Sequence, residues 1–222
     1  MNPSVKPANA PSRSSGPGRP KDLEKRAAIL AAAKCLFVLH GFEGTSMDAV
    51  ATAAGVSKLT VYSHFGDKDS LFREAVRARC HELMPEDVYT VDPTLPIRDT
   101  LMQIAKVHGN LMVSEVAIGT WRAILSDCRQ GNPRLGQMLW EEGPQRTQQL
   151  MERLLNHAEQ AGQLDIPDLH IAARQFLALL KGDTHFRRLF GCEDCNSDEF
   201  QREIEANVTA AVDMFLRAYA SR

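Results

Sequence analysis

The sequence predicts an all-α protein of about nine to ten helices, because three observations agree on this fold class. Apolar residues recur at the helical period from Ile29 to Tyr219. No segment alternates apolar and polar residues over the length of a strand. Glycines and prolines fall between the periodic segments, where helices end. These features indicate helices packed on helices throughout.

The length of 222 residues suits a small helical unit followed by a larger helical core. We expect three parts: an N-terminal arm at residues 1–20, a three-helix unit at 21–66, and a larger domain at 67–222. Within that domain, residues 67–83 should form a helix that connects it to the small unit.

The arm is rich in Pro, Ser, Gly and Asn and has no apolar period, so it is expected to be disordered. Its charged side chains are all cationic: Lys6, Arg13 and Arg19. Two interpretations stay open. The arm is either a solvated tail or a basic segment that follows a nucleic-acid backbone or enters a minor groove.

The first helix is predicted over Asp22 to His40 and should end at Gly41. Its apolar stripe consists of Ile29, Ala32, Ala33, Leu36 and Phe37. We expect Phe37, Phe42 and Val50 to form a small core that fixes the angle between the next two helices.

Residues 45–66 have the pattern of two short helices joined by a tight turn. Thr45 and Asp48 have the spacing of a capping box, which predicts a helix start at Thr45. Gly55 supplies the turn, and Ser57 can cap a second helix that ends at Gly66. This arrangement predicts a helix-turn-helix.

The outer face of the second helix carries polar and cationic side chains that cannot all be buried. Lysines can bind phosphate, hydroxyl and imidazole groups can donate hydrogen bonds, and Leu59 is small enough to approach a thymine methyl group. The face therefore predicts contact with the major groove through Lys58, Leu59, Thr60, Tyr62, Ser63, His64 and Lys68.

The run GRPKDLEKRAAILAAAKCLFVLHGFEGTSMDAVATAAGVSKLTVYSHFGDKDSLFREAV resembles the N-terminal domain of the TetR/AcrR family of transcriptional regulators along its whole length. The resemblance implies a dimeric, all-helical protein, usually a repressor, that binds double-stranded operator DNA and leaves it when a small molecule enters the C-terminal domain. It implies phosphate contacts by Thr45, Tyr62, His64 and Lys68 and base contacts by Lys58, Leu59, Tyr62 and Ser63. With Ser46 and Thr60, these residues form the expected DNA-binding set. Met47 departs from members that carry a base-reading cation there, so the first helix is not expected to read a base.

The connecting helix should begin after Asp67 as N-cap and run to about Leu83, where Pro85 stops it. Because it leaves the small unit and enters the larger domain, it is the expected lever between them. The proline-containing segment from Pro85 to Pro96 is predicted to be a loop.

In the larger domain, two amphipathic helices are expected around residues 101–112 and 117–128. A third should open at Pro133, break near Gly143 and Pro144, and continue to a stop at Gly162.

Two apolar helices should finish the chain, at 168–190 and 198–219. The second repeats Phe200, Ile204, Val208, Ala211, Val212, Phe215 and Tyr219, a stripe wider than a monomer's surface helix needs. The family pairs its last two helices in a dimer, so a homodimer through this stripe is expected. The spacing of residues in the C-terminal domain loosely resembles that of the AefR-like subset of the family.

Methionine, aromatic and histidine side chains in the larger domain can line an adaptable cavity for a small apolar or amphipathic effector. The alternative for each is an ordinary core position. The candidates are Met102, His108, Met112, Trp121, Leu125, Met138 and Phe176.

Charge is divided unevenly along the chain. The net charge is −2, yet residues 1–77 hold eleven Lys and Arg against seven Asp and Glu, a balance of +4 that leaves −6 for the remainder. A basic unit can meet DNA while the acidic remainder stays away from it.

Five cysteines at irregular spacing predict reduced thiols, and no signal peptide or membrane span is evident, so we expect a cytoplasmic protein without membrane contact. Cys192 and Cys195 form a CxxC with no second ligand pair, which favours a structural interpretation over a metal site and leaves a redox pair open. No cofactor is expected.

Two other classes of function fit the sequence less well. An enzyme would need a nucleophile elbow, a phosphate loop or a metal motif, and none is present in the sequence. A helical adaptor for proteins would leave the outward Lys58 and Tyr62 face unexplained. We therefore expect a transcriptional regulator that is not an enzyme; efflux or stress genes are its expected targets from the resemblance.

Overall fold

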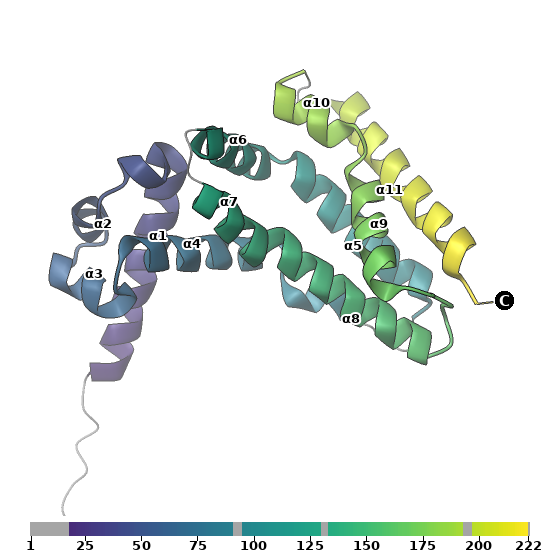
Figure 1. Ribbon diagram of the computed structural model, residues 1–222, viewed down its shortest axis with the longest axis horizontal. Helices are drawn as coiled ribbons and strands as arrows, with labels where there is room; N and C mark the ends of the chain where they lie inside the picture. The colour runs from purple at the N-terminus through teal and green to yellow at the C-terminus, as the bar shows by residue number, and fades with distance from the viewer. Residues whose placement is uncertain (1–17, 91–94, 130–132, 193–196, 222) are drawn as a thin grey trace, which may run out of the picture.

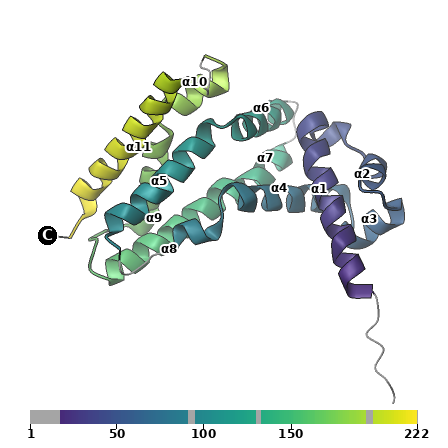
Figure 2. The same ribbon diagram turned by 180° about the vertical axis from the view of Figure 1, so that it is seen from behind.

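The computed structural model describes residues 18–90, 95–129, 133–192 and 197–221, and these residues form an all-helical, elongated molecule. Helices α1 to α4 make a compact head at one end, and the remaining helices extend away from it as the body (Figure 1). The view from behind shows the same division, with α11 at the end farthest from the head (Figure 2). The predicted fold class is confirmed in the part of the chain that the structure describes.

The head begins with α1 (Gly18–Gly44), followed by α2 (Met47–Ala53) and α3 (Lys58–Phe65). Gly41 is not helical, with φ 68° and ψ −179°, so the first helix turns where a glycine was predicted to end it. Gly55 and Gly66 also have positive φ, at the turn between α2 and α3 and at the end of α3. Residues 1–17, which include most of the predicted arm, lie outside the described residues.

The capping prediction for α2 is wrong by one residue. Ser46, not Thr45, is the N-cap, and its Oγ accepts a hydrogen bond from the Ala49 amide. Thr45 is 2% exposed, and its hydroxyl donates to the carbonyl oxygens of Leu36 and Gly41. Thr45 therefore ties α2 to the end of α1. Ser57 caps α3 as predicted, accepting from the Thr60 amide.

The predicted aromatic core of the head is present, with one addition. Phe37 and Phe42 are buried, and both contact Phe72 of α4 edge-on, with ring centroids 5.0 and 5.2 Å away. Val50 is buried in the same cluster. The connecting helix α4 (Lys68–Leu83) is therefore part of the head's core, and its N-cap is Asp67 as predicted.

The segment after α4 was predicted to be a loop, but it contains a short 3₁₀ helix at Glu86–Tyr89. Its Tyr89 is buried in the body core, which explains why the chain folds there instead of staying extended. Residues 91–94 lie outside the described residues.

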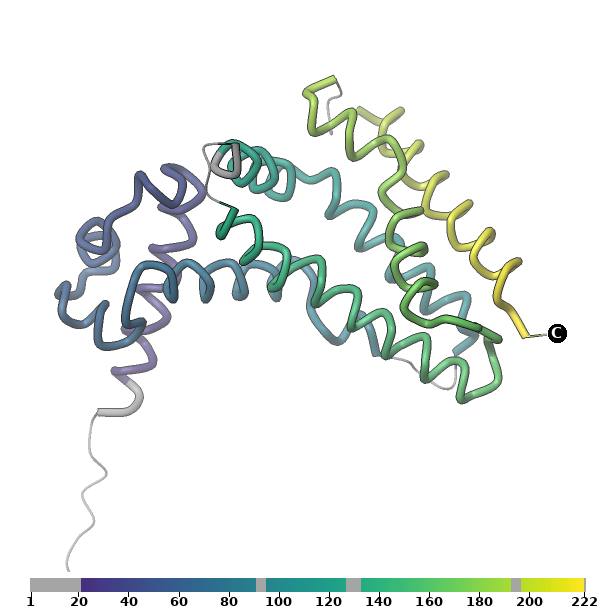
Figure 3. The backbone as a smooth tube through the Cα atoms, viewed as in Figure 1, coloured from purple at the N-terminus to yellow at the C-terminus, as the bar shows by residue number. Residues whose placement is uncertain are grey.

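The body continues with α5 (Ile97–Val113), α6 (Glu115–Arg129) and α7 (Pro133–Trp140). A π-helical segment at Glu141–Gln145 then joins α7 to α8 (Arg146–Gln160). The predicted break at Gly143 and Pro144 is thus a widened turn inside one continuous rod (Figure 3). Pro144 has no backbone N–H and cannot donate a helical hydrogen bond. The wider π turn tolerates this residue because the hydrogen bonding rearranges locally around the missing donor.

The helix predicted at 168–190 is two helices: α9 (Leu169–Lys181) and α10 (Thr184–Phe190). Gly182 separates them with φ 54°, and a side chain there would press on Asn207 of α11. The Asn207 side chain donates to the carbonyl oxygens of Leu179 and Leu180, which satisfies the end of α9. The final helix, α11 (Asp198–Tyr219), is capped by Ser197.

The apolar stripe of α11 lies inside the chain, so its assignment to a dimer interface is wrong. Its six residues from Phe200 to Phe215 are buried in one cluster with α5, α8 and α9. The approach to α5 is close: a Cβ on Gly109 would lie 2.6 Å from the Val208 Cγ1. Helical periodicity predicted burial correctly, but the partner surface belongs to the same chain.

Candidate DNA-binding surface and effector cavity

Helix α3 presents an open face formed by side chains that make few internal contacts. Leu59 is 79% exposed and Tyr62 is 41% exposed, and Lys58 and Ser63 are exposed beside them. Val61 and Phe65 point the other way and are buried in the head's core. The inward anchors fix the helix, so the outward side chains are available to a groove.

Lys58 is paired across the turn before any DNA arrives. Its Nζ lies 2.8 Å from the Asp48 Oδ2 on α2, with both side chains more than half exposed. The hydrogen bond from Lys58 to Asp48, together with the charge of that carboxylate, raises the pKa of Lys58. The cation is therefore held on the exposed face of α3, and its other N–H groups are open to a further acceptor.

Three predicted DNA-contact residues lie in positions that sequence periodicity did not anticipate. The Thr45 side chain is buried, as described above, and we remove it from the contact set. The His64 side chain is 12% exposed, with Nε2 3.3 Å from an Asp22 carboxylate oxygen on α1. The Lys68 Nζ sits 4.4 Å from the centroid of the Phe42 ring. Ser46 is the exposed N-cap of α2, and the Thr60 hydroxyl lies 2.8 Å from the Oγ of Ser57, the N-cap of α3.

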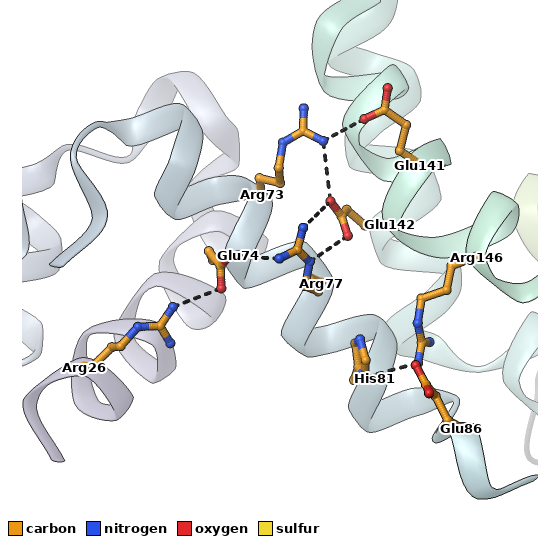
Figure 4. Close-up of polar contacts among 9 residues, drawn as sticks. All are labelled: Arg26, Arg73, Glu74, Arg77, His81, Glu86, Glu141, Glu142 and Arg146. Atoms are coloured by element: carbon orange, nitrogen blue, oxygen red, sulfur yellow. Dashed lines mark hydrogen bonds and ion pairs between the residues drawn. The ribbon is translucent and has the colours of Figure 1, made fainter. Parts of the chain in front are cut away.

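Behind this face, ion pairs connect the head to the body (Figure 4). The Arg26 guanidinium of α1 stacks on the Phe65 ring at 4.9 Å and donates to Glu74 of α4. Glu74 also accepts a hydrogen bond from Arg77. Arg77 in turn donates through two nitrogens to Glu142 of the π-helical segment, at 2.9 and 3.0 Å. A continuous set of contacts thus runs from α3 to the π-helical segment.

Arg73 strengthens the same junction. It donates to Glu141 at 2.6 Å and lies 3.4 Å from Glu142. Hydrogen bonds from these arginines lower the pKa values of both carboxyl groups, with Arg73 first for Glu141 and Arg77 first for Glu142. Farther along α4, Arg146 of α8 contacts His81 and donates to Glu86. Helix α4 is therefore clamped to the body at several points along its length.

A cavity of about 1050 Å³ lies between the head and the body. Its wall is built from α1 and α4 of the head and from α5 to α9 of the body, including Gly143 and Pro144 of the π-helical segment. This volume is in the range of small-molecule sites. The π-helical segment and α4 therefore belong both to the cavity wall and to the ion pairs that hold α4 against the body.

Three of the predicted ligand residues line this cavity: His108, Met112 and Trp121. The other four do not. Phe176 is fully buried in the body core, and Met138 is buried in the cluster that includes the head's core. Met102 packs against the body core, and Leu125 is 51% exposed on α6. Residue type alone could not separate core from cavity wall.

Sequence reasoning missed the cationic part of the cavity wall. Helix α9 contributes Ile171, Arg174, Ala178 and Lys181, which follow one helical face. The recurrence of cations at positions 174 and 181 of an otherwise apolar helix is a signal that could have identified this face.

His108 is the most unusual group in the wall. It is 5% exposed, and within the described residues neither ring nitrogen has a hydrogen-bond partner. Burial first, and then the positive charges of Lys181 and His185, lower the pKa of His108 to about 3. Burial also lowers the pKa of Lys181. His185 differs because its Nδ1 donates to the Met112 carbonyl oxygen at 2.7 Å.

The cysteines supply no assembled metal site in the described part of the chain, where no group of three or more His, Cys, Asp and Glu side chains is placed to hold an ion. Cys192 is exposed, and Cys195 lies outside the described residues. Cys80 lines the cavity, and burial raises the pKa of its thiol to about 11.

One segment, at 21–44, is long and apolar enough to cross a membrane by length and composition. Its stripe of Ile29, Ala33 and Phe37 packs into the head's core, and Gly41 interrupts its helical backbone.

Two family profiles match the chain. Residues 29–75 match "Bacterial regulatory proteins, tetR family", and residues 99–221 match "AefR-like transcriptional repressor, C-terminal domain". The uncharacterised regulator YhgD of Bacillus subtilis is 28% identical over 124 residues, which cover 47% of this chain and 65% of YhgD. The match therefore spans less than two thirds of that curated relative.

Solved structures match over more of their length. A TetR-family regulator from Mesorhizobium loti has a TM-score of 0.75 at 28% identity, covering 90% of this chain and 98% of that one. The flavonoid-responsive regulator FrrA has a TM-score of 0.72 at 31% identity, covering 89% of this chain and 98% of FrrA. The family profiles, the head's helix-turn-helix and this whole-chain likeness agree, and the chain belongs to the TetR family of bacterial transcriptional regulators, which are not enzymes.

Proposed function

We propose that this chain is a cytoplasmic repressor that binds a palindromic operator as a homodimer and leaves it when a small amphipathic molecule enters the cavity. One observation carries the proposal: the head's own helices α1 and α4 form part of the cavity wall. A molecule that fills the cavity must contact both the head and the body. Its occupancy and the position of the head are therefore expected to depend on each other.

The proposed reading set is smaller than sequence reasoning suggested. Lys58, Leu59, Tyr62 and Ser63 are exposed on α3 and are proposed to contact base edges or nearby phosphates. Lys68 and Ser46 at the helix starts are proposed to bind phosphate. His64 is proposed to act from the edge of the face because its side chain is largely enclosed.

The proposed dimer uses a different surface from the one expected from periodicity. With the stripe of α11 buried, the remaining large apolar side chains at this end of the body are Phe186 and Phe190 of α10 and Met214 of α11, each more than half exposed. An ion pair between Arg187 and Glu203 holds the two helices together. A twofold dimer through this surface would present two reading helices to half-sites about 34 to 36 Å apart, or a multiple of that distance.

The proposed path from effector to DNA passes through the π-helical segment. Gly143 and Pro144 line the cavity, while Glu141 and Glu142 in the same segment hold Arg73 and Arg77 of α4. A molecule that displaces this segment would move the acids that position α4. Since α4 is part of the head's core, the two heads of a dimer would change their separation.

The relatives support a small-molecule effector. FrrA is described as flavonoid-responsive, and at 31% identity it is similar to this chain over most of its length. The body matches a profile of AefR-like transcriptional repressors, which supports the proposal that this chain represses its target genes. The regulated genes proposed from the family resemblance are those of efflux or stress responses.

Footprinting on the DNA that flanks the chain's own gene tests the proposal. We expect protection of a palindrome, with affinity that falls steeply as salt rises because lysines on the head displace counterions from phosphate. A head variant with Lys58→Ala and Tyr62→Ala is the control and should not protect the site. Protection by that variant, or equal affinity for operator and scrambled DNA, would refute sequence-specific binding through α3.

A further inference from the structure

The cavity wall is charged with one sign. Its lining includes Lys34, Arg79, Arg174 and Lys181, and none of the described residues that form it is Asp or Glu. Lys34 and Arg79 both pair with one acid, Glu82 of α4, so each has an ion-pair partner although a single carboxylate balances only one of the two charges. Arg174 and Lys181 make no ion pair with any residue that the structure describes. The two cavity cations without an ion-pair partner among the described residues therefore both lie on α9.

His108 faces the same cavity with unused hydrogen-bonding capacity. Its two ring nitrogens are buried and have no partner among the described side chains and backbone groups. A buried polar group without a partner destabilises the protein by about 1 to 3 kcal/mol. Because the ring is neutral, it has one N–H donor and one acceptor nitrogen without partners, and a bound molecule reaches them when the side chains that cover the ring move aside.

Lys181 and His108 act on the same part of the cavity. The positive charge of Lys181 is one of the causes that depress the pKa of His108, so the two groups are electrostatically coupled. The carboxylates of Glu115, Glu141 and Glu142 lie on neighbouring elements, but Glu115 pairs with Arg188 and the other two pair with α4. None of these three acids lines the cavity.

Much of the remaining wall is apolar, with Thr120, Thr147, Gln148 and Gln175 as its uncharged polar members. Val38, Leu83, Leu111, Met112, Trp121 and Ile124 come from the head and body helices on either side. Apolar and aromatic surfaces of this kind bind a hydrocarbon or aromatic body through burial. The cavity thus combines extensive apolar surface with cations on α9 that have no ion-pair partner among the described residues.

We propose that the effector is an amphipathic organic anion whose acidic group pairs with Lys181 and accepts a hydrogen bond from His108, while its apolar body lies against Trp121 and the head helices. This proposal rests on the proposed function and names the chemical class of its effector. An anion satisfies the lysine and the histidine together. A neutral apolar molecule would leave both groups buried without partners, and a cation would meet repulsion from Lys181.

A matched pair of fluorescent probes separates the charge from the apolar body. 1-Anilinonaphthalene-8-sulfonate carries a permanently ionised sulfonate, and N-phenyl-1-naphthylamine has the same aromatic rings without it. We expect the wild-type chain to bind one sulfonate probe per cavity. Lys181→Met should weaken binding of the sulfonate about 10- to 100-fold and change binding of the neutral probe less than about twofold.

Lys106→Met is the matched control, since Lys106 is exposed on α5 and does not line the cavity. It should leave the affinity of both probes unchanged, and Lys181→Arg should retain sulfonate binding because it keeps the charge. Circular dichroism of each variant checks that the helices are intact. If Lys181→Met weakens both probes equally or neither probe, or if the wild type fails to bind the sulfonate, the anion site is wrong.

The same variants distinguish a failure of the anion site from a failure of the proposed control of DNA binding by an effector. Operator binding by Lys181→Met is first measured without probes, and every effect of a probe is then expressed relative to the affinity of that same variant. If sulfonate binding depends on Lys181 but never changes operator affinity, the anion site stands and effector control fails. If the sulfonate releases operator DNA equally well from the wild type and from Lys181→Met, the regulatory proposal stands and the anion site is wrong.

Discussion

Lys58 and Lys181 lie in the two regions proposed to receive ligands, and the structure holds them in opposite states. Lys58 is exposed on the head and already paired with Asp48. Lys181 is partly buried in the cavity wall and has no ion-pair partner among the described residues. Binding at the head would therefore compete with, or add to, a partner that Lys58 already has, whereas binding in the cavity would supply a partner that the fold leaves out.

This difference predicts how each region should respond to substitution. An ion pair at an exposed surface contributes little free energy, and salt screens that contribution. Contacts in a partly buried site are less screened, and their loss leaves desolvated groups behind. We therefore expect substitutions in the body core to change stability most and substitutions on α3 to change the preference among DNA sequences most. Substitution of the exposed acid Asp48, which competes with DNA for Lys58, should have a smaller effect, on DNA affinity.

The largest expected effect is the loss of stability when the body core is opened. Phe176 is fully buried, and its ring centroid lies 4.9 Å from that of Phe215. Phe176→Ala should lower the free energy of unfolding by about 3 to 5 kcal/mol because it leaves a cavity. Leu23→Ala on the exposed side of α1 should change it by less than about 0.5 kcal/mol. Urea unfolding at one protein concentration measures the free energy of unfolding of both variants. A similar loss of stability in the two variants would contradict the expected difference between the buried and the exposed position.

The reading face should show its effect in sequence preference. Lys58→Ala should cost about 1 to 3 kcal/mol of discrimination at particular operator base pairs, if Lys58 leaves Asp48 for a base edge. Lys68→Ala should instead weaken all DNA sequences similarly and reduce the salt slope by about one unit. Competition among singly mutated operators measures the difference. An unchanged ranking of operators in the Lys58 variant would assign its side chain to phosphate.

Buried His108 should make stability depend on pH. Its pKa is lowered from 6.5 to about 3, so the unfolded chain binds the proton at a pH where the folded chain does not. The free energy of unfolding should therefore fall as pH drops from about 6.5 towards 3, by about 2 kcal/mol between pH 7 and pH 5. His108→Leu should remove that part of the pH dependence.

Urea unfolding at the two pH values tests this result, with exposed His40→Gln as the control that retains the wild-type dependence. Equal pH dependence in the wild type and in His108→Leu would mean that His108 gains a proton in the folded state, and its hydrogen-bonding role in the cavity would have to be revised.

Sequence signals predicted the head well because most of them are local. Ser57, Asp67, Gly55 and Gly66 act within one turn of chain, and each was assigned correctly. The error at Thr45 arose because two adjacent hydroxyl residues could both cap a helix. The choice between them is made by carbonyl groups at the end of α1, which accept from Thr45. That constraint is tertiary, so spacing could not reveal it.

The body was harder to predict because its cavity is formed by convergence. Lys181 and the head residue Val38 line one space although the sequence places them far apart. The buried stripe of α11 teaches a related lesson, since periodicity reports that a face is covered and does not say by which chain. The split at Gly182 was also missed, because the close approach of Asn207 that favours glycine there comes from another helix.

The junction between the two regions should control how strongly they communicate. Glu142→Gln weakens the paired hydrogen bonds to Arg77 and removes a charge from the clamp on α4. Allosteric coupling is typically about 1 to 3 kcal/mol, and we expect this substitution to change it by about 0.5 to 2 kcal/mol. The measurement compares operator affinity with and without a saturating cavity ligand.

Glu152→Gln is the matched control for the junction, because Glu152 pairs with His170 on α9 and does not contact α4. It should leave the coupling at the wild-type value. The same coupling in Glu142→Gln and in the wild type would show that the effector acts on α4 by another route, such as direct contact with the α4 residues in the cavity wall.

The smallest expected effect is an increase in DNA affinity when Asp48 loses its charge. The Asp48 carboxylate lies on the reading face, where it both occupies Lys58 and repels phosphate. Asp48→Asn should therefore tighten binding to operator and scrambled DNA alike, by less than about 1 kcal/mol because the pair is exposed. Asp99→Asn is matched to it, since Asp99 also sits in the first turn of a helix but lies in the body. Anisotropy titrations at two salt concentrations measure both variants, and Asp99→Asn should have no effect. Weaker operator binding by Asp48→Asn would reverse the interpretation of the pair: Asp48 would then orient Lys58 for DNA, and the head, like the cavity, would depend on a positioned cation.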